Sequence, residues 1–351
     1  MCSRLTLSWI VTAALLLASP PARACTTFAA ASAQGRLVAK GFDWSTGQGW
    51  LVWTERGRAY PPLAPGDVPL AGAPARFANL SLTTVAPGFP SSGMNEAGLV
   101  IEALVDGSSP TVQAIEPGKL ISLELVQQGL SRFATVAELA AFAEKAGFTP
   151  LAVPLHLFAC DRAGACVVVE RGGGRVRVTR ALPVAALANR PYAEDLDDSR
   201  SPRGLLAWLG IRRLRAHPQS SQARFRTVAD ALHAGPLRDE PQALALLERV
   251  AMGPRTQWQM IWNQDLGTLA LRQPAAGINS LRLRLADLRA TCEGPVQVRP
   301  LGVAASRFEA WSPVDVAAVQ TRVPAQLRRS SPVVERLAAA LGRVASASSC
   351  R

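Results

Sequence analysis

The sequence predicts an α+β fold in which two antiparallel β-sheets are stacked together and helices lie outside them. Strand-like and helical segments come in groups: strands, two helices, more strands, two helices, and strands again. No internal repeat and no clear linker divides the chain. A plain β-sandwich has no place for the helical pairs, and a doubly wound parallel sheet would need regular alternation of strands and helices. We therefore expect one large domain of this class.

The first group of strands begins with a hairpin. Residues 26–32 and 37–44 are strand-like and flank a turn at Ala33-Gln34-Gly35, so they should pair. Residues 60–75 are rich in Pro and Gly and should form a loop, and residues 92–98 are rich in Gly and Asn and should form a turn. The remaining strands of this group are expected at residues 51–55, 80–85 and 99–105.

Two helical pairs interrupt the later strands. Thr135 and Glu138 form a capping box that should open a helix ending near Lys145, directly after a helix at residues 120–133. A turn at Asp161-Arg162-Ala163-Gly164 should join the two strands of a hairpin within residues 155–169. Further strands are expected at residues 175–178, 256–263, 268–272 and 280–285, and residues 187–192 end another strand-like run. Further helices are expected at residues 223–234, 241–251 and 333–344.

The first 24 residues have the three parts of a cleaved secretory signal. Arg4 supplies a positive charge, residues 5–18 are mostly apolar, and Ala22-Arg23-Ala24 is a small-x-small cleavage site. The apolar run is short for a membrane span. Cleavage after Ala24 would leave Cys25 at the N-terminus of a periplasmic or secreted protein. A lipoprotein signal, which would give an acyl-lipidated surface protein, stays open as an alternative, although the large aliphatic residue it prefers three positions before the cysteine is missing.

Cysteine usage and charge limit the remaining function classes. Without the signal, 327 of the 351 residues and five of the six cysteines would remain, so one thiol should be free. Cys160 can pair with Cys166 across the hairpin, and Cys292 is then the natural partner of Cys350, which leaves Cys25; a structural Cys25 is the alternative. The net charge of +12 comes from scattered arginines without a basic block, so no nucleic-acid partner and no stable membrane insertion are expected.

Several stretches of the sequence resemble the choloylglycine hydrolase family. This family contains penicillin V acylases and bile salt hydrolases and belongs to the N-terminal-nucleophile hydrolases. The resemblance runs from Cys25 to about Arg272. Five stretches carry it: Cys25-Thr26-Thr27-Phe28; Lys40-Gly41-Phe42-Asp43-Trp44; Gly93-Met94-Asn95-Glu96-Ala97-Gly98-Leu99; Leu187-Ala188-Asn189; and Arg224-Phe225 followed by Thr256-Gln257-Trp258. The family fold is a four-layer αββα sandwich, in agreement with the order of elements. The resemblance implies a catalytic domain at 25–305, followed by an extension at 306–351.

The resemblance also implies roles for single residues. Cys25 looks like the nucleophile, and Asp43 sits where the family has an aspartate that holds the α-amino group. Asn189 matches the asparagine whose amide donates to the oxyanion, and Arg224 matches an arginine that braces the site by its charge. If the alignment register slips, Arg226 is the rival of Arg224.

Two positions depart from the family pattern. Lys40 stands where many members have arginine; lysine keeps the positive charge but lacks the planar fork. Val105 stands where a backbone N–H is the second oxyanion donor and where bile salt hydrolases often have asparagine. This difference argues against a bile salt as the substrate. His156, His217 and His233 are scattered, and a Cys-His hydrolase fits poorly because His156 lies in an apolar strand.

The chemistry follows from a thiol and an α-amine on one residue. Their ordinary pKa values, about 8.5 and about 7.7–8.0, both lie near working pH, so the amine can take the thiol proton. The resemblance therefore implies an exported hydrolase of linear, non-peptide amides with a small N-acyl amide substrate, no cofactor and no metal. A non-catalytic exported binding protein on the same fold and a bile salt hydrolase are the alternatives. The sequence leaves the oligomeric state, including a homo-oligomer, open.

Overall fold

The computed structural model describes residues 24–63, 72–110, 112, 114–151, 153–200, 219–303, 307–327 and 332–351. The expected signal segment lies outside the described residues except for Ala24, and so does the middle of the expected loop at 60–75. Among the described residues, no helix has the length and apolar character needed to cross a membrane.

The first of the two large sheets contains strand β1, which carries Cys25. Its six strands run in the order β13-β1-β2-β14-β15-β16, and every neighbouring pair is antiparallel. The expected hairpin is confirmed, because Cys25 of β1 lies opposite Phe42 of β2. The strands are β1 (Ala24–Ser32), β2 (Gly35–Asp43), β13 (Ala186–Leu187), β14 (Thr256–Asn263), β15 (Thr268–Gln273) and β16 (Ile278–Arg284).

The second sheet has nine strands in the order β12-β11-β10-β7-β6-β5-β3-β17-β18, again antiparallel throughout. Two short ladders complete the pairing: β8 (Leu120–Ile121) with β9 (Phe148–Thr149), and β4 (Arg58–Ala59) with β19 (Ser349–Cys350). The nine strands are β3 (Trp50–Thr54), β5 (Asn79–Thr83), β6 (Ser92–Asn95), β7 (Val100–Val105), β10 (Leu155–Cys160), β11 (Cys166–Gly172), β12 (Arg175–Arg180), β17 (Gln297–Pro300) and β18 (Glu309–Ala310).

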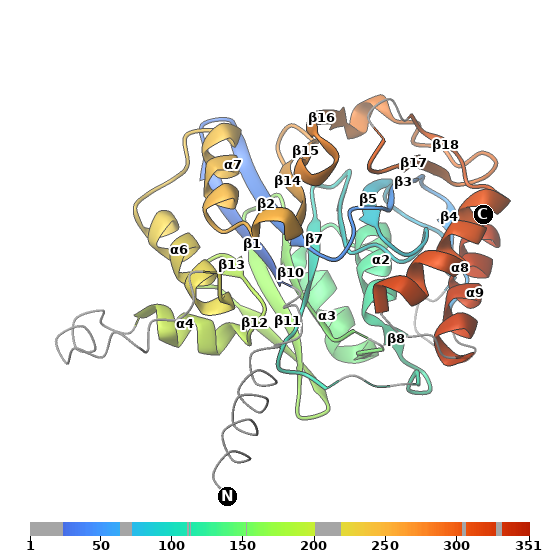
Figure 1. The fold of residues 1–351 in the computed structure, drawn as a ribbon, viewed down its shortest axis with the longest axis horizontal. Coiled ribbons are helices and arrows are strands. Elements are labelled where there is room, and N and C mark those ends of the chain that lie inside the picture. Colours follow the sequence, from blue (N-terminus) through green and yellow to red (C-terminus); the bar gives the residue numbers. More distant parts are fainter. Residues whose placement is uncertain are drawn as a thin grey trace, which may run out of the picture.

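The helices cover the outer faces of the two sheets (Figure 1). Helices α6 (Ser221–His233) and α7 (Glu240–Arg249) pack on β1 and β2 of the six-stranded sheet, and α4 (Tyr192–Arg200) packs on α6. Helices α2 (Ser122–Arg132) and α3 (Val136–Ala146) pack on β7 and β11 of the nine-stranded sheet. The four-layer αββα arrangement is therefore confirmed, as is the capping box of Thr135 and Glu138 at the start of α3.

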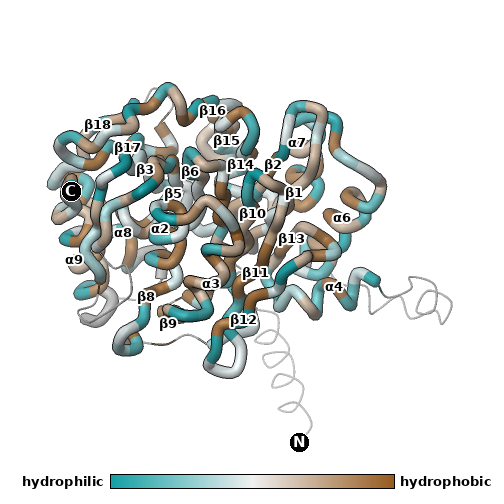
Figure 2. Tube along the Cα trace, turned by 180° about the vertical axis from the view of Figure 1, so that it is seen from behind, coloured by the Kyte–Doolittle hydropathy of each residue, from teal (hydrophilic) through white to brown (hydrophobic). Residues whose placement is uncertain are grey.

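Three apolar clusters hold the layers together, and burial of apolar area is the main force that stabilises them. The cluster between the sheets contains Phe28, Val38 and Phe158, all fully buried. A second lies between the nine-stranded sheet and helices α2 and α3. A third contains Trp50 and Trp311 and lies under α8 (Pro313–Leu327) and α9 (Pro332–Ser346). In Figure 2 the brown, hydrophobic stretches follow the central strands, whereas teal lies mostly on the rim.

The structure differs from the sequence-based prediction at three elements. Residues 92–98 are not only a turn: Ser92–Asn95 form strand β6 between β5 and β7, and the turn follows, with Gly98 at a φ of +85°. A Cβ on Gly93 would lie 2.5 Å from Leu130 Cδ1, so close packing of α2 explains a glycine within this strand. Helices α4 and α8 were not expected; α8 carries a proline, Pro324, inside a helix.

Both expected disulfides are present. Cys160 pairs with Cys166 across the β10–β11 hairpin, and Cys292 pairs with Cys350. Cys25 is the free cysteine of the described residues, and it is buried.

Candidate active site

Cys25 lies near the start of β1, with 1% of its surface exposed. On the neighbouring strand β2, Phe42 lies opposite Cys25, and Asp43 follows it in the chain. Burial raises the pKa of the Cys25 thiol, and the positive charges of Lys40 and Arg224 oppose this rise. The thiol is therefore a weak acid here, and it needs a nearby base to react.

Asn189 and Arg224 hold the backbone of Cys25 from the other side. The Cys25 N–H donates to Asn189 Oδ1 at 2.8 Å, and the Cys25 carbonyl accepts from Arg224 Nη1 at 2.5 Å. Arg224 Nη2 also donates to Asn189 Oδ1, at 2.7 Å, and Nη1 donates to the hydroxyl of Thr26. One buried guanidinium thus fixes both the backbone of Cys25 and the side-chain amide of Asn189. Arg226, the rival position, donates instead to the backbone carbonyl of Asp198.

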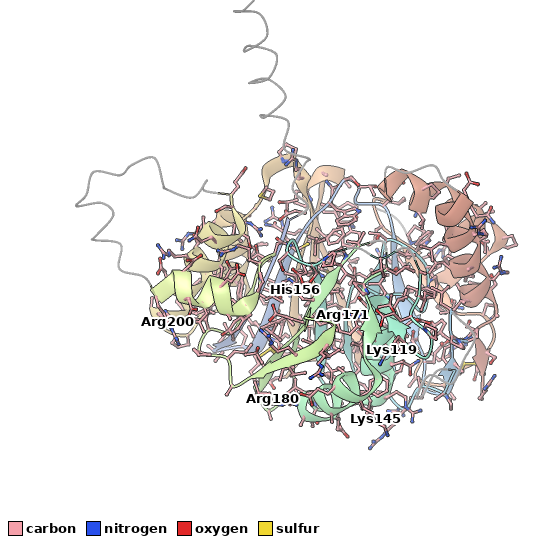
Figure 3. The ribbon with its side chains drawn as sticks, turned by 90° about the horizontal axis from the view of Figure 1, so that it is seen from below. Lys119, Lys145, His156, Arg171, Arg180 and Arg200 are labelled. Atoms are coloured by element: carbon pink, nitrogen blue, oxygen red, sulfur yellow. A yellow bond between two sulfur atoms is a disulfide. The ribbon has the colours of Figure 1, made fainter. Side chains whose placement is uncertain are left out.

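The loop that carries Asn189 is held at several points. The backbone N–H of Asn189 donates to Ser221 Oγ at 2.7 Å, and the backbone carbonyl of Asn189 accepts from Gly107 N at 2.8 Å. Its side-chain Nδ2 donates to the Val105 carbonyl at 2.8 Å. His156, fully buried on β10, contacts the carbonyl of Ala188 through Nε2 at 2.8 Å. Figure 3 places His156 within the body of the molecule. These contacts fix the orientation of the Asn189 side chain.

Asp43 is buried beside the nucleophile, but its carboxylate does not contact Cys25 N in this structure, where that nitrogen is a peptide amide. Oδ1 accepts from Thr256 Oγ1 at 2.5 Å, and Thr256 Oγ1 in turn accepts from the backbone N–H of Met252 at 2.8 Å. Burial raises the pKa of Asp43 to about 6, and the hydrogen bond from Thr256 partly opposes this. Asp43 therefore titrates near neutral pH.

Lys40 lies in the core between the two sheets and is part of a buried ion pair. Its Nζ is 2.9 Å from Glu102 Oε2 and donates to the carbonyls of Ser91 and Ala103, both at 2.9 Å. Glu102 Oε1 also accepts from Ser92 Oγ and Trp262 Nε1. The three N–H donors of the ammonium group each have an acceptor, so Lys40 acts on the site through its charge and through the strands it joins.

Val105 and Cys25 both line a cavity of about 120 Å³. Its walls are almost entirely apolar, with Phe42 and Trp44 near the nucleophile and Leu155 beside Val105. The C-terminal helices contribute Val323, Leu337 and Leu341. The cavity gives the thiol an apolar chamber that could receive an organic group attached to a carbonyl.

The structure thus brings together Cys25, Asp43, Asn189, Arg224 and Val105, and places Lys40 behind them. The sequence reasoning did not identify Glu102, although a single glutamate within the apolar segment 99–105 signals a paired buried charge. It also did not identify Ser221 and Thr256 as supports of the site. Thr256 stands in one of the stretches that carry the resemblance, but no local signal gives either residue this supporting role, because their partners are distant in the chain.

Comparison with known proteins identifies the fold. No protein-family model matches the sequence, and no curated protein matches it. Penicillin V acylase from Agrobacterium tumefaciens superposes with a TM-score of 0.66 at 20% identity, covering 82% of this chain and 98% of the other. A mutant of the conjugated bile acid hydrolase from Clostridium perfringens superposes with a TM-score of 0.61 at 17% identity, covering 82% and 96%. The resemblance to the choloylglycine hydrolases is therefore confirmed at the level of the fold, which this chain shares with both proteins.

Proposed function

We propose that this chain is an exported N-acyl amide hydrolase of the choloylglycine hydrolase family, with Cys25 as its nucleophile. The observation that carries the proposal is the placement of Asn189 and Arg224 on the backbone of Cys25, a residue that lines an apolar cavity. Removal of residues 1–24 would turn the Cys25 nitrogen into an α-amine. The printed sequence supports this step with its small-x-small site at 22–24.

The proposed reaction begins with a proton transfer from the Cys25 thiol to its own α-amine. The thiolate attacks the amide carbonyl carbon, and the carbonyl oxygen becomes an oxyanion. The amide of Asn189 has two N–H groups, and Val105 O takes one of them, so the other can donate to this oxyanion. The backbone N–H of Val105 is the proposed second donor.

The intermediate then collapses. The C–N bond breaks, the leaving amine takes the proton held by the α-ammonium group, and a thioester remains on Cys25. The α-amine next takes a proton from water, and the resulting hydroxide attacks the thioester carbonyl. Release of the carboxylic acid returns the proton to the thiol. Arg224 keeps Asn189 oriented through both steps, because its guanidinium is bonded to the amide oxygen.

The cavity supports a small, apolar acyl group. An engineered apolar cavity of about 150 Å³ binds benzene, and the cavity here measures about 120 Å³. A four-ring steroid needs far more space, so phenoxyacetyl or medium-chain acyl groups fit the cavity better than bile acids. We therefore rank penicillin V and N-acyl homoserine lactones, substrates that the family resemblance suggests, above conjugated bile salts. A bile salt hydrolase stays the second candidate, supported by the bile acid hydrolase among the fold neighbours.

The test is a comparison of kcat/KM for penicillin V, an N-acyl homoserine lactone and glycine-conjugated cholate on protein that begins at Cys25. We expect turnover of the first two and little of the third. Cys25→Ala should lose activity on all of them and should keep the circular dichroism spectrum of the wild type. Equal activity in Cys25→Ala would refute the mechanism. Fastest turnover of the bile salt would refute the ranking, and no turnover of any amide would favour a binding protein on this fold.

A further inference from the structure

The C-terminal helices α8 and α9 form part of the wall of the cavity that Cys25 lines. Val323 of α8 and Leu337 and Leu341 of α9 line the same chamber as the nucleophile. These residues lie about 300 positions after Cys25 in the chain. Figure 1 shows α8 and α9 side by side along one flank of the nine-stranded sheet. The segment after 306 is therefore part of the chamber as well as a cover for the domain.

The position of this hairpin is fixed by a group of aromatic and charged contacts. Trp311 packs edge-on against Trp50 of β3, with ring centres 5.2 Å apart, and Trp50 Nε1 donates to Asp315 Oδ1 at 3.0 Å. The guanidinium of Arg322 lies 4.4 Å from the centre of the Trp50 ring. Because Trp50 is fully buried, α8 has little freedom to move away from the sheet.

The end of the hairpin is tied down a second time. Cys350 is bonded to Cys292, and Ser349–Cys350 pair with Arg58–Ala59 of β4. The backbone N–H of the last residue, Arg351, donates to the carbonyl of Gly57 at 2.9 Å. A wall held at both ends keeps a constant distance from the thiol, which is what a size-selective pocket requires.

We propose that the α8–α9 hairpin is the end wall of the acyl pocket, and that Leu341 and Leu337 set the length of the acyl chain that this chain accepts. The inference rests on the proposed function, because it treats the chamber as the acyl site. Its ligand is an apolar acyl group joined to a small amine. Each methylene that the wall admits or excludes changes affinity about fourfold, the ratio that corresponds to about 0.8 kcal/mol.

The test uses Cys25→Ala protein and a series of N-acylglycines from butanoyl to dodecanoyl, with dissociation constants measured by calorimetry. In the Leu341→Ala background the preferred chain should lengthen by about two methylene groups, with a gain of about fifteenfold for the longer chain. Leu341→Phe should shorten the preferred chain. The matched control is Val344→Ala, since Val344 is also buried on α9 but does not line this chamber.

The outcomes separate this proposal from the proposed function. Binding with a length preference that moves in Leu341→Ala, and not in Val344→Ala, supports the wall even if no amide is hydrolysed. An unchanged preference in Leu341→Ala, or equal shifts in both variants, overturns it even if hydrolysis is fast. Failure of every N-acylglycine to bind also overturns it. Leu337→Ala provides a second variant if Leu341→Ala does not fold.

A different observation concerns the polar content of the chamber. Ser122, the first residue of α2, lines the cavity and is 3% exposed, yet its hydroxyl has no hydrogen-bond partner among the residues that the structure describes. A buried hydroxyl without a partner is costly, and one that faces a ligand cavity can be satisfied by the ligand. We infer that Ser122 donates to an oxygen on the acyl group, such as an ether or keto oxygen, and that the preferred acyl group carries one.

The probes for Ser122 are pairs of acylglycines that differ in one position. Phenoxyacetyl is compared with 3-phenylpropanoyl, and 3-oxooctanoyl with octanoyl, on Cys25→Ala protein. The oxygen-bearing member of at least one pair should bind about fivefold more tightly, and Ser122→Ala should remove this preference while binding of the hydrocarbon chain changes little. Absence of a preference in both pairs, or a preference that persists in Ser122→Ala, overturns the inference.

Discussion

The two ends of the chamber are held by different kinds of force. At the nucleophile end, Asn189 and Arg224 join Cys25 in a buried network of hydrogen bonds and charges. At the other end, α8 and α9 present leucine and valine side chains, and their position depends on aromatic packing and one disulfide. If the proposed function holds, the first end sets whether the reaction can occur, while the second sets which acyl groups can enter. Changes at the first should therefore abolish function, and changes at the second should redirect it.

The largest expected effect on stability comes from the buried ion pair behind the nucleophile. Lys40→Met would leave Glu102 charged, fully buried and without its cation, which typically costs about 3–5 kcal/mol. Urea unfolding should show this loss. The double variant Lys40→Met/Glu102→Gln should recover at least half of it, because the neutral amide needs no counter-charge. A double variant as unstable as the single one would show that the strands, and not the charge pair, carry the effect.

The second prediction tests the other end through the two disulfides. They close loops of very different length, with sequence separations of 58 for Cys292–Cys350 and 6 for Cys160–Cys166. The chain-entropy model gives losses of about 4 and about 2 kcal/mol on removal. Replacement of each pair by serine, followed by urea unfolding, checks the order. Loss of Cys292–Cys350 should also weaken the acyl-length preference, whereas loss of Cys160–Cys166 should leave that preference intact.

The third prediction concerns the proposed oxyanion donor. Asn189→Ala should lower kcat by a factor of about 10²–10³, corresponding to about 2.7–4 kcal/mol, with a smaller change in KM. Arg226→Ala is the matched control, because Arg226 lies on the same helix as Arg224 but contacts Asp198 instead of the Asn189 side chain. Similar losses in both variants would indicate a general disturbance of this region rather than loss of a donor.

The smallest predicted effect is a pH dependence of stability from Asp43. In a form that keeps a residue before Cys25, the pKa of Asp43 is raised by burial from 3.8 to about 6. The folded state therefore holds this proton when the unfolded state has already lost it, so stability falls by about 2 kcal/mol as the pH rises from about 4 to about 6. Asp43→Asn should flatten this part of the curve. A stability that rises equally in both proteins over this range would contradict the assignment.

The order of elements and the site motifs could be predicted from the sequence because both depend on residues that are close together in the chain. The β1–β2 hairpin, the capping box at Thr135 and the pairing of Cys160 with Cys166 each depend on residues a few positions apart. The stretches around Cys25 and Asn189 could be recognised by their residue types. Their roles in the reaction stay predictions until the activity is measured.

The α8–α9 hairpin and strand β6 could not be predicted, because the local sequence signals conflict with the structure or the deciding contacts are distant in the chain. Pro324 disfavours a helix by local propensity, yet α8 forms because its apolar face packs on Trp50 and α9. The sequence of strand β6 predicts a turn because Ser92, Gly93 and Asn95 have low strand propensity. The segment is extended in the structure because it pairs with β5 on one side and β7 on the other. The contact of Leu341 with the chamber of Cys25 has no local signature at all.

The most direct test of the central claim compares two proteins that differ by a single residue at the N-terminus. One begins at Cys25 and the other carries one glycine before it, which turns the α-amine into an amide as in this structure. Intact mass confirms each terminus, and kcat/KM is measured on penicillin V or, if it is not turned over, on the best N-acyl amide. We expect the extended protein to lose activity while its circular dichroism spectrum and urea midpoint stay close to those of the first. Equal kcat/KM in the two proteins would contradict an α-amine as the base.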